Sequence, residues 1–183
     1  MKTGTKIGIY SHADTTCGNK HAFIESVIEV LTVDAIPFDD SSGKMFNLPI
    51  VHAIYAYDDP ESLRTFLLQF NNAIYIKNVK NALLCPNQAR EHGTIVDNVP
   101  PHLDHTGKIT FSVSTSEHAF HLQQHGPTAC LQLRRPTNEE MDNLDIIDFT
   151  GEHEWKPYNE IHKSNDAHFS MIITTRQFHI AQW

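Results

Sequence analysis

The sequence predicts a mainly β protein, and three observations support this prediction. Short apolar runs rich in Ile, Val, Phe and Tyr recur along the chain, separated by clusters of Asp, Asn, Gly and Pro, which is the pattern of strands and turns. The run over residues 23–33 consists mostly of β-branched apolar residues, which favours a pair of strands over an amphipathic helix. Helix start and stop signals mark only two short segments. We therefore expect strands to dominate the fold.

The expected strands are short and follow one another closely along the chain. Turn-forming residues separate several of them, at residues 39–43, 58–60 and 71–72. The strands are predicted over residues 6–10, 23–33, 51–57, 63–70, 73–76, 94–96, 109–115, 118–122, 129–133, 146–149, 168–175 and 178–181.

Two segments carry the signals of short helices. Pro86 suits the first position of a helix, and Gly93 suits the left-handed residue after its end, so we expect a helix of about two turns over residues 86–92. Thr137 and Glu140 have the spacing of a capping box, which predicts a second short helix over residues 138–144.

The composition excludes some classes of function. Of the 183 residues, 40% are hydrophobic and 20% are charged, which is typical of a globular domain rather than of a disordered chain. The formal net charge is -8 and Arg134-Arg135 is the only basic doublet, so the clustered cations that bind nucleic acid or an anionic membrane are missing. We expect a peptide or small-molecule partner, with no nucleic acid and no membrane.

Cysteine usage and hydropathy indicate the compartment. Cys17, Cys85 and Cys130 are widely spaced and form no CxxC pair, which favours free thiols in a reducing compartment. No apolar stretch approaches the roughly 18 residues of a transmembrane helix, and the N-terminal apolar run is too short for a signal core. We therefore expect an intracellular, cytoplasmic protein.

The composition changes after Pro100-Pro101, where a polar stretch separates two strand-rich parts. We place a soft boundary near residues 98–106. The prediction is a domain over residues 1–100 followed by a β-rich C-terminal extension over residues 101–183.

Three stretches, in order, resemble the aspartic-protease segment of copia-type retrotransposon polyproteins. Residues 11–17 (SHADTTC) are similar to the family motif D-S-G/H-A-D-T-x-C. Residues 49–60 end in AYDDP, like a strand of the family. Residues 72–100 resemble its NQALY…NxLLCPNQ…G…VDDVP segment, and the likeness extends over roughly residues 8–150.

This resemblance implies a retropepsin-like fold, namely a small closed β barrel with a flap hairpin and one short helix. It also implies a homodimer in which each subunit contributes one aspartate, because the catalytic dyad needs two carboxylates that share a proton. The implied substrate is a peptide or the polyprotein itself. The implied location is the cytoplasm or a retroelement particle, and neither a cofactor nor a metal is expected.

The chain departs from the family at the catalytic position. Aligning residues 13–15 with the motif places Tyr10, Ser11 and His12 on the triplet that begins with the catalytic aspartate. A tyrosine, with a reference pKa of about 10, cannot act as the carboxylate base. The sequence therefore predicts that peptidase activity is lost or weakened.

Besides the interpretation that the chain is an altered copy of an active parent, a second interpretation keeps this chain itself active. In it Asp14 and Thr15 are the catalytic pair, and Ser11, His12 and Ala13 contact the substrate. The alternative is that Asp14 braces a turn through hydrogen bonds to nearby N–H groups.

Two other classes of function stay open. The first is a non-enzymatic module that binds peptides or assembles with a partner on the same scaffold. The second is a metal-dependent hydrolase that uses His102, Asp104 and His105, although Pro100 stands where the HxHxDH motif has its leading histidine. Two weaker patterns are the pair His118 and His121 and the segment 168–171, which resembles half of a two-histidine phosphoesterase motif.

Overall fold

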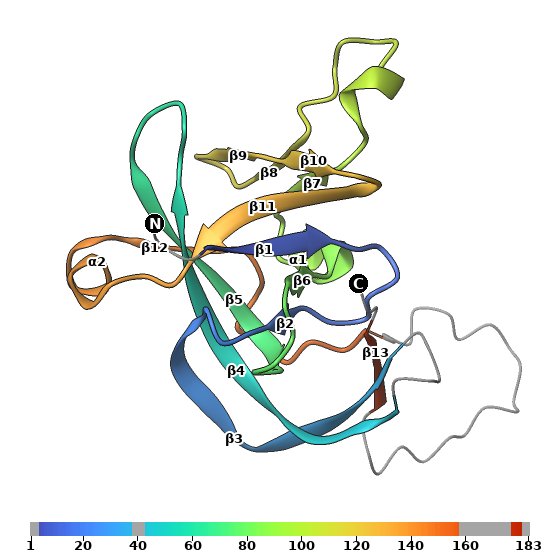
Figure 1. Cartoon of the computed structure of the whole chain (residues 1–183), viewed down its shortest axis with the longest axis vertical. Helices are drawn as coiled ribbons and strands as arrows, with labels where there is room; N and C mark the ends of the chain where they lie inside the picture. Colours follow the sequence, from blue (N-terminus) through green and yellow to red (C-terminus); the bar gives the residue numbers. More distant parts are fainter. Residues whose placement is uncertain (1–3, 38–42, 158–176, 181–183) are drawn as a thin grey trace, which may run out of the picture.

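The computed structural model describes residues 4–37, 43–157 and 177–180, and it is mainly β, as the sequence predicts (Figure 1). Most of its strands form one sheet in the order β10-β11-β1-β6-β2-β5-β4-β3-β13, and β12 pairs with β5 beside this path. A small second sheet has the order β7-β8-β9. The strands are β1 (Gly4–Ile9), β2 (Cys17–Gly18), β3 (Phe23–Pro37), β4 (Met45–Asp58), β5 (Thr65–Tyr75), β6 (Ala82–Leu84), β7 (Ile95–Asp97), β8 (Ser112–Ser114), β9 (Ala119–His121), β10 (Gln123–His125), β11 (Thr128–Arg134), β12 (Ile146–Asp148) and β13 (Gln177–Ile180).

Strand β11 connects two distant parts of the main sheet. It pairs antiparallel with β1 and also with β4, through Arg134 and Ala56. The pairings that start at β11 and pass through β1, β6, β2, β5 and β4 therefore lead back to β11. The Arg134 side chain, which is 6% exposed, strengthens this junction by binding the carboxylates of Asp58 and Glu140 at 2.6–2.7 Å.

Residues 23–37 form one long strand, so the pair of strands predicted over residues 23–33 is wrong. The run contains no Gly, Pro, Asn or Asp that would end a strand. β3 and β4 instead form a long antiparallel hairpin whose register shifts at three places. Such irregularities let a long strand bend without a break. The curved hairpin lies in the lower part of Figure 1.

The turn predicted at Asn71-Asn72 is also wrong, because β5 runs straight through these two residues. Asn72 has a φ of 54°, a left-handed conformation that asparagine tolerates, and the register with β4 shifts opposite it, between Val51 and Ala53. The pair is therefore a bulge within a strand. The predicted strand over residues 63–70 starts two residues later, because Leu63 lies in the preceding turn with a φ of 57°.

Both predicted short helices are confirmed. Helix α1 (Pro86–Glu91) begins at the proline and is followed by Gly93, whose φ of 91° is the left-handed conformation expected there. Helix α2 (Asn138–Asn143) begins after Thr137, which forms the predicted capping box with Glu140. No helix in the described part of the chain is long and apolar enough to cross a membrane.

The small sheet packs on the main sheet through aromatic side chains. Phe120 of β9 lies with its ring centroid 5.2–5.5 Å from the rings of Tyr57, Phe66 and Phe149. Phe149 in turn contacts Phe70 at 5.3 Å. One buried cluster that spans both sheets contains Tyr57, Phe70, Phe120 and Phe149, and the partly buried Phe66 packs against it, which indicates that the small sheet shares the core of the main one.

Strands beyond the predicted boundary near residue 100 join the main sheet. β11 pairs with β1 and β4, β12 with β5, and β13 with β3. The strand predicted over residues 168–175, and the segment 168–171 within it, lie outside the described residues. The strand predicted over residues 178–181 corresponds to β13.

Candidate functional site

The segment that carries the first family motif is a tight loop between β1 and β2. Tyr10 continues the pairing of β1 by donating its N–H to the carbonyl of Leu84 at 3.2 Å, and its own carbonyl accepts the N–H of Ala13 at 3.2 Å. Ser11 and His12 form the exposed tip of this turn, where their side chains lie 3.2 Å apart. The Tyr10 ring is half-buried and packs against the apolar cluster under the β3–β4 hairpin.

The second half of the loop is buried and held by backbone hydrogen bonds. The N–H of Thr16 donates to Gln88 Oε1 at 2.9 Å, and the carbonyl of Thr16 accepts the N–H of Ile74 at 2.9 Å. The Thr16 hydroxyl accepts the N–H of Cys85 at 3.1 Å. These bonds connect the loop to α1, to β5 and to Cys85, which lies between β6 and α1.

Asp14 and Thr15, the catalytic pair in the interpretation that keeps the chain active, differ in their exposure to solvent. The carbonyl of Asp14 accepts the indole N–H of Trp155 at 2.7 Å, and Asp14 is half-buried. Thr15 is 2% exposed, and its hydroxyl has no hydrogen-bond partner among the described groups. The Thr15 hydroxyl is therefore not presented to a substrate at the surface of the monomer.

The residues expected to contact a substrate are separated by exposure. Ser11 and His12 are exposed, and the His12 ring lies 5.6 Å from that of Tyr10. Ala13 is buried, so it offers a substrate no accessible side chain. The loop 10–16 contains one carboxylate, that of Asp14, so a dyad of two carboxylates would need the Asp14 of a second subunit.

The three cysteines are free, as the sequence predicts, and they lie in the packed interior. All three are buried and unpaired. Burial, together with the neighbouring Cys85, raises the pKa of the Cys17 thiol. Burial raises the pKa of Cys85 as well, and the nearby Asp14 carboxylate adds to this. Neither thiol is therefore a thiolate nucleophile at neutral pH.

The residues of the possible metal hydrolase do not gather into a ligand set. The Asp104 carboxylate accepts the N–H groups of Thr106, Gly107 and Ile109 at 2.7–2.9 Å, which lowers its pKa. His102 and His105 are exposed beside it. Within the described ranges there is no group of three or more His, Cys, Asp or Glu side chains that could hold a metal ion.

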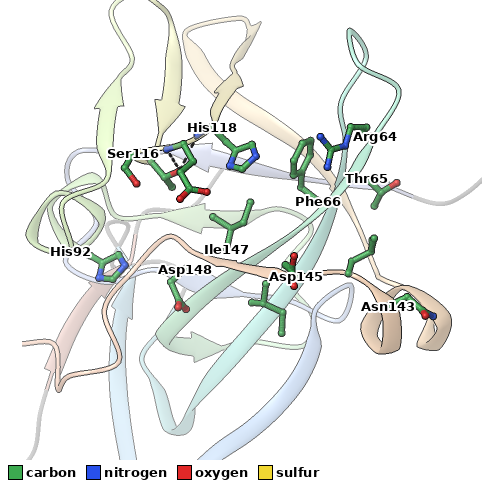
Figure 2. A pocket seen from close by; sticks show the side chains of 14 residues that line it. Arg64, Thr65, Phe66, His92, Ser116, His118, Asn143, Asp145, Ile147 and Asp148 are labelled. Atoms are coloured by element: carbon green, nitrogen blue, oxygen red, sulfur yellow. Dashed lines mark hydrogen bonds between the residues drawn. The ribbon is translucent and has the colours of Figure 1, made fainter.

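A cavity of about 610 Å³ lies on another part of the molecule, between β12 and the turn that joins β8 to β9 (Figure 2). Figure 2 shows Ile147 pointing into it, with Ser116 and His118 opposite, Arg64 near one end and His92 near the other. The lining includes every residue from 143 to 148. Its size is within the range of ligand-binding clefts.

Sequence reasoning missed this cavity, because its walls come from four separate segments. His118 is the one lining residue that the sequence had singled out, and it contacts Phe66 at 5.0 Å, whereas His121 lies apart from the cavity lining. The charged lining residues are Arg64, Glu117, Asp145 and Asp148. No local pattern connects residues so far apart in the chain.

Comparisons with protein-family models, with curated proteins and with solved structures give no match for this chain.

Proposed function

We propose that the chain is a retroelement-derived, retropepsin-like domain whose peptidase activity is lost or weakened because Tyr10 occupies the catalytic position. The proposal rests on the three ordered motifs and on where the fold places them. The motif-bearing loop follows β1 directly, and the chain has a long β3–β4 hairpin, which would serve as the implied flap under this proposal. Helix α1 follows β6, in the place of the short helix that the resemblance implies.

The return of the strand pairings to β11 supports the closed barrel that this proposal requires. The ring of β11, β1, β6, β2, β5 and β4 contains six strands, which suits a small barrel. Arg134 reinforces the contact between β11 and β4, where the ring closes, through its bonds to Asp58.

Tyr10 is the observation that carries the loss of activity. Its backbone is fixed by the bonds to Leu84 and Ala13, and its ring packs against apolar side chains. A carboxylate at this position would follow β1 directly and stand beside the exposed tip formed by Ser11 and His12. The tyrosine provides no carboxylate, so the general-base step of an aspartic peptidase has no group to perform it.

The test compares cleavage of a reduced, alkylated protein mixture from pH 4 to 7. The natural chain is expected to cleave weakly or not at all, whereas Tyr10→Asp is expected to gain activity that a statine-type inhibitor blocks. Tyr10→Asn is the matched control, because it has nearly the same shape as Asp but cannot ionise. Asp14→Asn tests the alternative catalytic carboxylate.

Two results would overturn the proposal. If the natural chain cleaves efficiently and Asp14→Asn does not, then Asp14 is the catalytic carboxylate and the alignment is wrong. If a folded, dimeric Tyr10→Asp variant cleaves nothing, the scaffold is not a retropepsin. The implied homodimer is checked on the same samples by light scattering.

A further inference from the structure

Strand β12 has one paired edge and one open edge. It runs parallel to β5, with Ile146 opposite Leu67, Ile147 opposite Leu68 and Asp148 opposite Gln69. In the part of the chain that the structure describes, no strand pairs with its other side. An open edge presents N–H and C=O groups that can pair with another extended chain.

The pairing with β5 shows which backbone groups face outward. The N–H of Phe149 donates to the carbonyl of Gln69 at 2.8 Å, so Phe149 points its N–H toward β5. Backbone groups of successive residues in a strand point to opposite edges, and those of Ile147 therefore also face β5. The N–H and C=O groups of Ile146 and Asp148 then lie on the open edge.

Consecutive residues of β12 line the cavity of about 610 Å³, together with residues 64–66 at the start of β5. Side chains of successive strand residues point to opposite faces, so a cavity over one face would be lined by alternate residues only. Here the lining includes Asp145, Ile146, Ile147 and Asp148 without a gap. The cavity into which Ile147 points therefore also reaches the backbone of β12.

The edge is rigidly held before any partner arrives. Asn71 donates to the Asp148 carboxylate and to the carbonyl of Thr150, both at 2.8 Å. The Asn72 side chain donates to three successive carbonyls, those of Gly151, Glu152 and His153, at 2.8–3.2 Å. Because the strand and the segment after it are already ordered, a partner would not have to order them on binding.

The charges around the cavity favour a basic partner. Three carboxylates line it, those of Glu117, Asp145 and Asp148, against one guanidinium, that of Arg64. Phe66 and Ile147 supply apolar surface between them. A second copy of β12 would bring Asp145 and Asp148 against the same two carboxylates, and such like-charge pairs are unfavourable.

We propose that the open edge of β12 binds an extended peptide segment of another protein, in which basic and apolar side chains alternate, by addition of a strand. The outward N–H and C=O groups of Ile146 and Asp148 pair with the peptide backbone, and its lysine or arginine side chains meet Glu117 and Asp145. This site is separate from the loop 10–16 and does not depend on the proposed function.

The experiment is a titration of the ¹⁵N-labelled full chain, followed by two-dimensional NMR, with an acetylated and amidated hexapeptide of alternating lysine and valine. The expected result is saturable shifts at the amides of Ile146 and Asp148, together with slower hydrogen exchange there. Two matched peptides serve as controls, one with glutamate in place of lysine and one with N-methyl groups on one backbone edge. Both are expected to bind at least about tenfold more weakly.

Variants test the same contacts from the protein side. Asp145→Lys is expected to weaken binding about tenfold, whereas Glu25→Lys, an equal charge change on exposed β3, is expected to leave it unchanged. Ile146→Pro removes one outward N–H and is expected to abolish binding. Ile146→Ala keeps this N–H and is expected to keep the binding.

Three results would overturn the proposal: chemical shift changes confined to other regions, equal binding of the N-methylated or glutamate peptide, or self-association through β12. The peptide controls decide the question even if Ile146→Pro fails to fold. Cleavage is not part of the readout. Failure here would therefore leave the retropepsin proposal standing, and failure of Tyr10→Asp to gain activity would leave this one standing.

Discussion

The loop at residues 10–16 and the strand β12 differ in how much of their hydrogen-bonding capacity the fold already uses. In the loop, the N–H and C=O of Thr16 and the N–H of Tyr10 all have partners within the chain. In β12, Ile146 and Asp148 keep one backbone edge unpaired within the described structure. The groups of the loop named here are therefore paired within the chain, whereas the edge of β12 keeps unpaired N–H and C=O groups in the described structure.

Gln88 connects the two regions. Its side-chain carbonyl accepts the N–H of Thr16 in the loop, and its amide donates to the carbonyl of Asn71 at 3.0 Å. Asn71 in turn holds Asp148 of β12. The buried polar side chains thus form one continuous network between the motif-bearing loop and the open strand, so a change at Gln88 is expected to affect both.

The largest expected effect is a loss of stability when the packing of the small sheet on the main sheet is disrupted. Phe120→Ala removes the ring that packs the small sheet on Tyr57, Phe66 and Phe149, and it should lower the free energy of unfolding by about 4 kcal/mol. Urea unfolding followed by circular dichroism measures this. Phe46→Ala is the control, because Phe46 is 62% exposed and its loss should cost about 0.5 kcal/mol or less. Equal losses in both variants would show that the small sheet is not packed on the main one.

The next largest effect is expected when the hydrogen bonds of Gln88, which connect the loop at residues 10–16 with Asn71, are removed. Gln88→Leu leaves the N–H of Thr16 and the carbonyl of Asn71 without this partner, and it should destabilise the chain by about 2–3 kcal/mol. Hydrogen exchange should then accelerate both at Thr16 and around β12. Asn87→Leu, at an exposed position of the same helix, is the matched control and should change neither. Faster exchange at only one of the two regions would contradict the idea of a shared network.

A smaller effect concerns Thr15 and Thr16 in the loop, where the same substitution is expected to change the free energy of unfolding in opposite directions. Thr15→Val replaces a buried hydroxyl that has no partner among the described groups, so it should raise the free energy of unfolding by about 1 kcal/mol. Thr16→Val removes the acceptor of the Cys85 N–H and should lower it by about 1–2 kcal/mol. Thermal and urea unfolding of the pair measure both. If Thr15→Val is destabilising, or weakens a dimer seen by light scattering, its hydroxyl has a partner in the assembled protein.

The smallest effect concerns the exposed turn at residues 104–109, away from both regions. Three backbone N–H groups and the Thr106 hydroxyl lower the pKa of Asp104 below its reference value of 3.8. The stabilising contribution is therefore present above the unfolded-state pKa and is lost as the pH falls through the lower folded-state value. A ¹³C NMR titration of the carboxyl carbon should show this low pKa, and Asp104→Asn should remove the acid-dependent change of the Ile109 amide. An Asp104 pKa at or above 3.8 would contradict the assigned turn.

Local sequence signals predicted the parts of the fold that local interactions determine. The Pro86 start, the Gly93 stop and the capping box of Thr137 and Glu140 are satisfied by residues within a few positions, and both helices are found where they were expected. Most strands are also close to their predicted ranges. The wide spacing of the cysteines predicted free thiols, and all three are unpaired.

The failures occurred where distant residues override a local signal. Asn71-Asn72 has the composition of a turn, but its amides find partners at residues 148–153, almost eighty positions away, and this keeps β5 continuous. The run over residues 23–33 contains no residue that ends a strand, and β4 pairs with both of its ends, on either side of a register shift between Val27 and Thr32. The cavity at β12 could not be predicted at all, because its walls meet only in the folded chain.

The sequence by itself determined the β-rich class and the two short helices, because each depends on residue type and short-range spacing. Only the tertiary structure decided which backbone edges are used and which remain open. Pairing brings Arg134 of β11 to β4 and brings β12 beside β5, and these contacts join residues about eighty positions apart. The physical reason is that backbone hydrogen-bonding capacity is the same at every non-proline residue, so its use depends on which strands the folded chain places side by side.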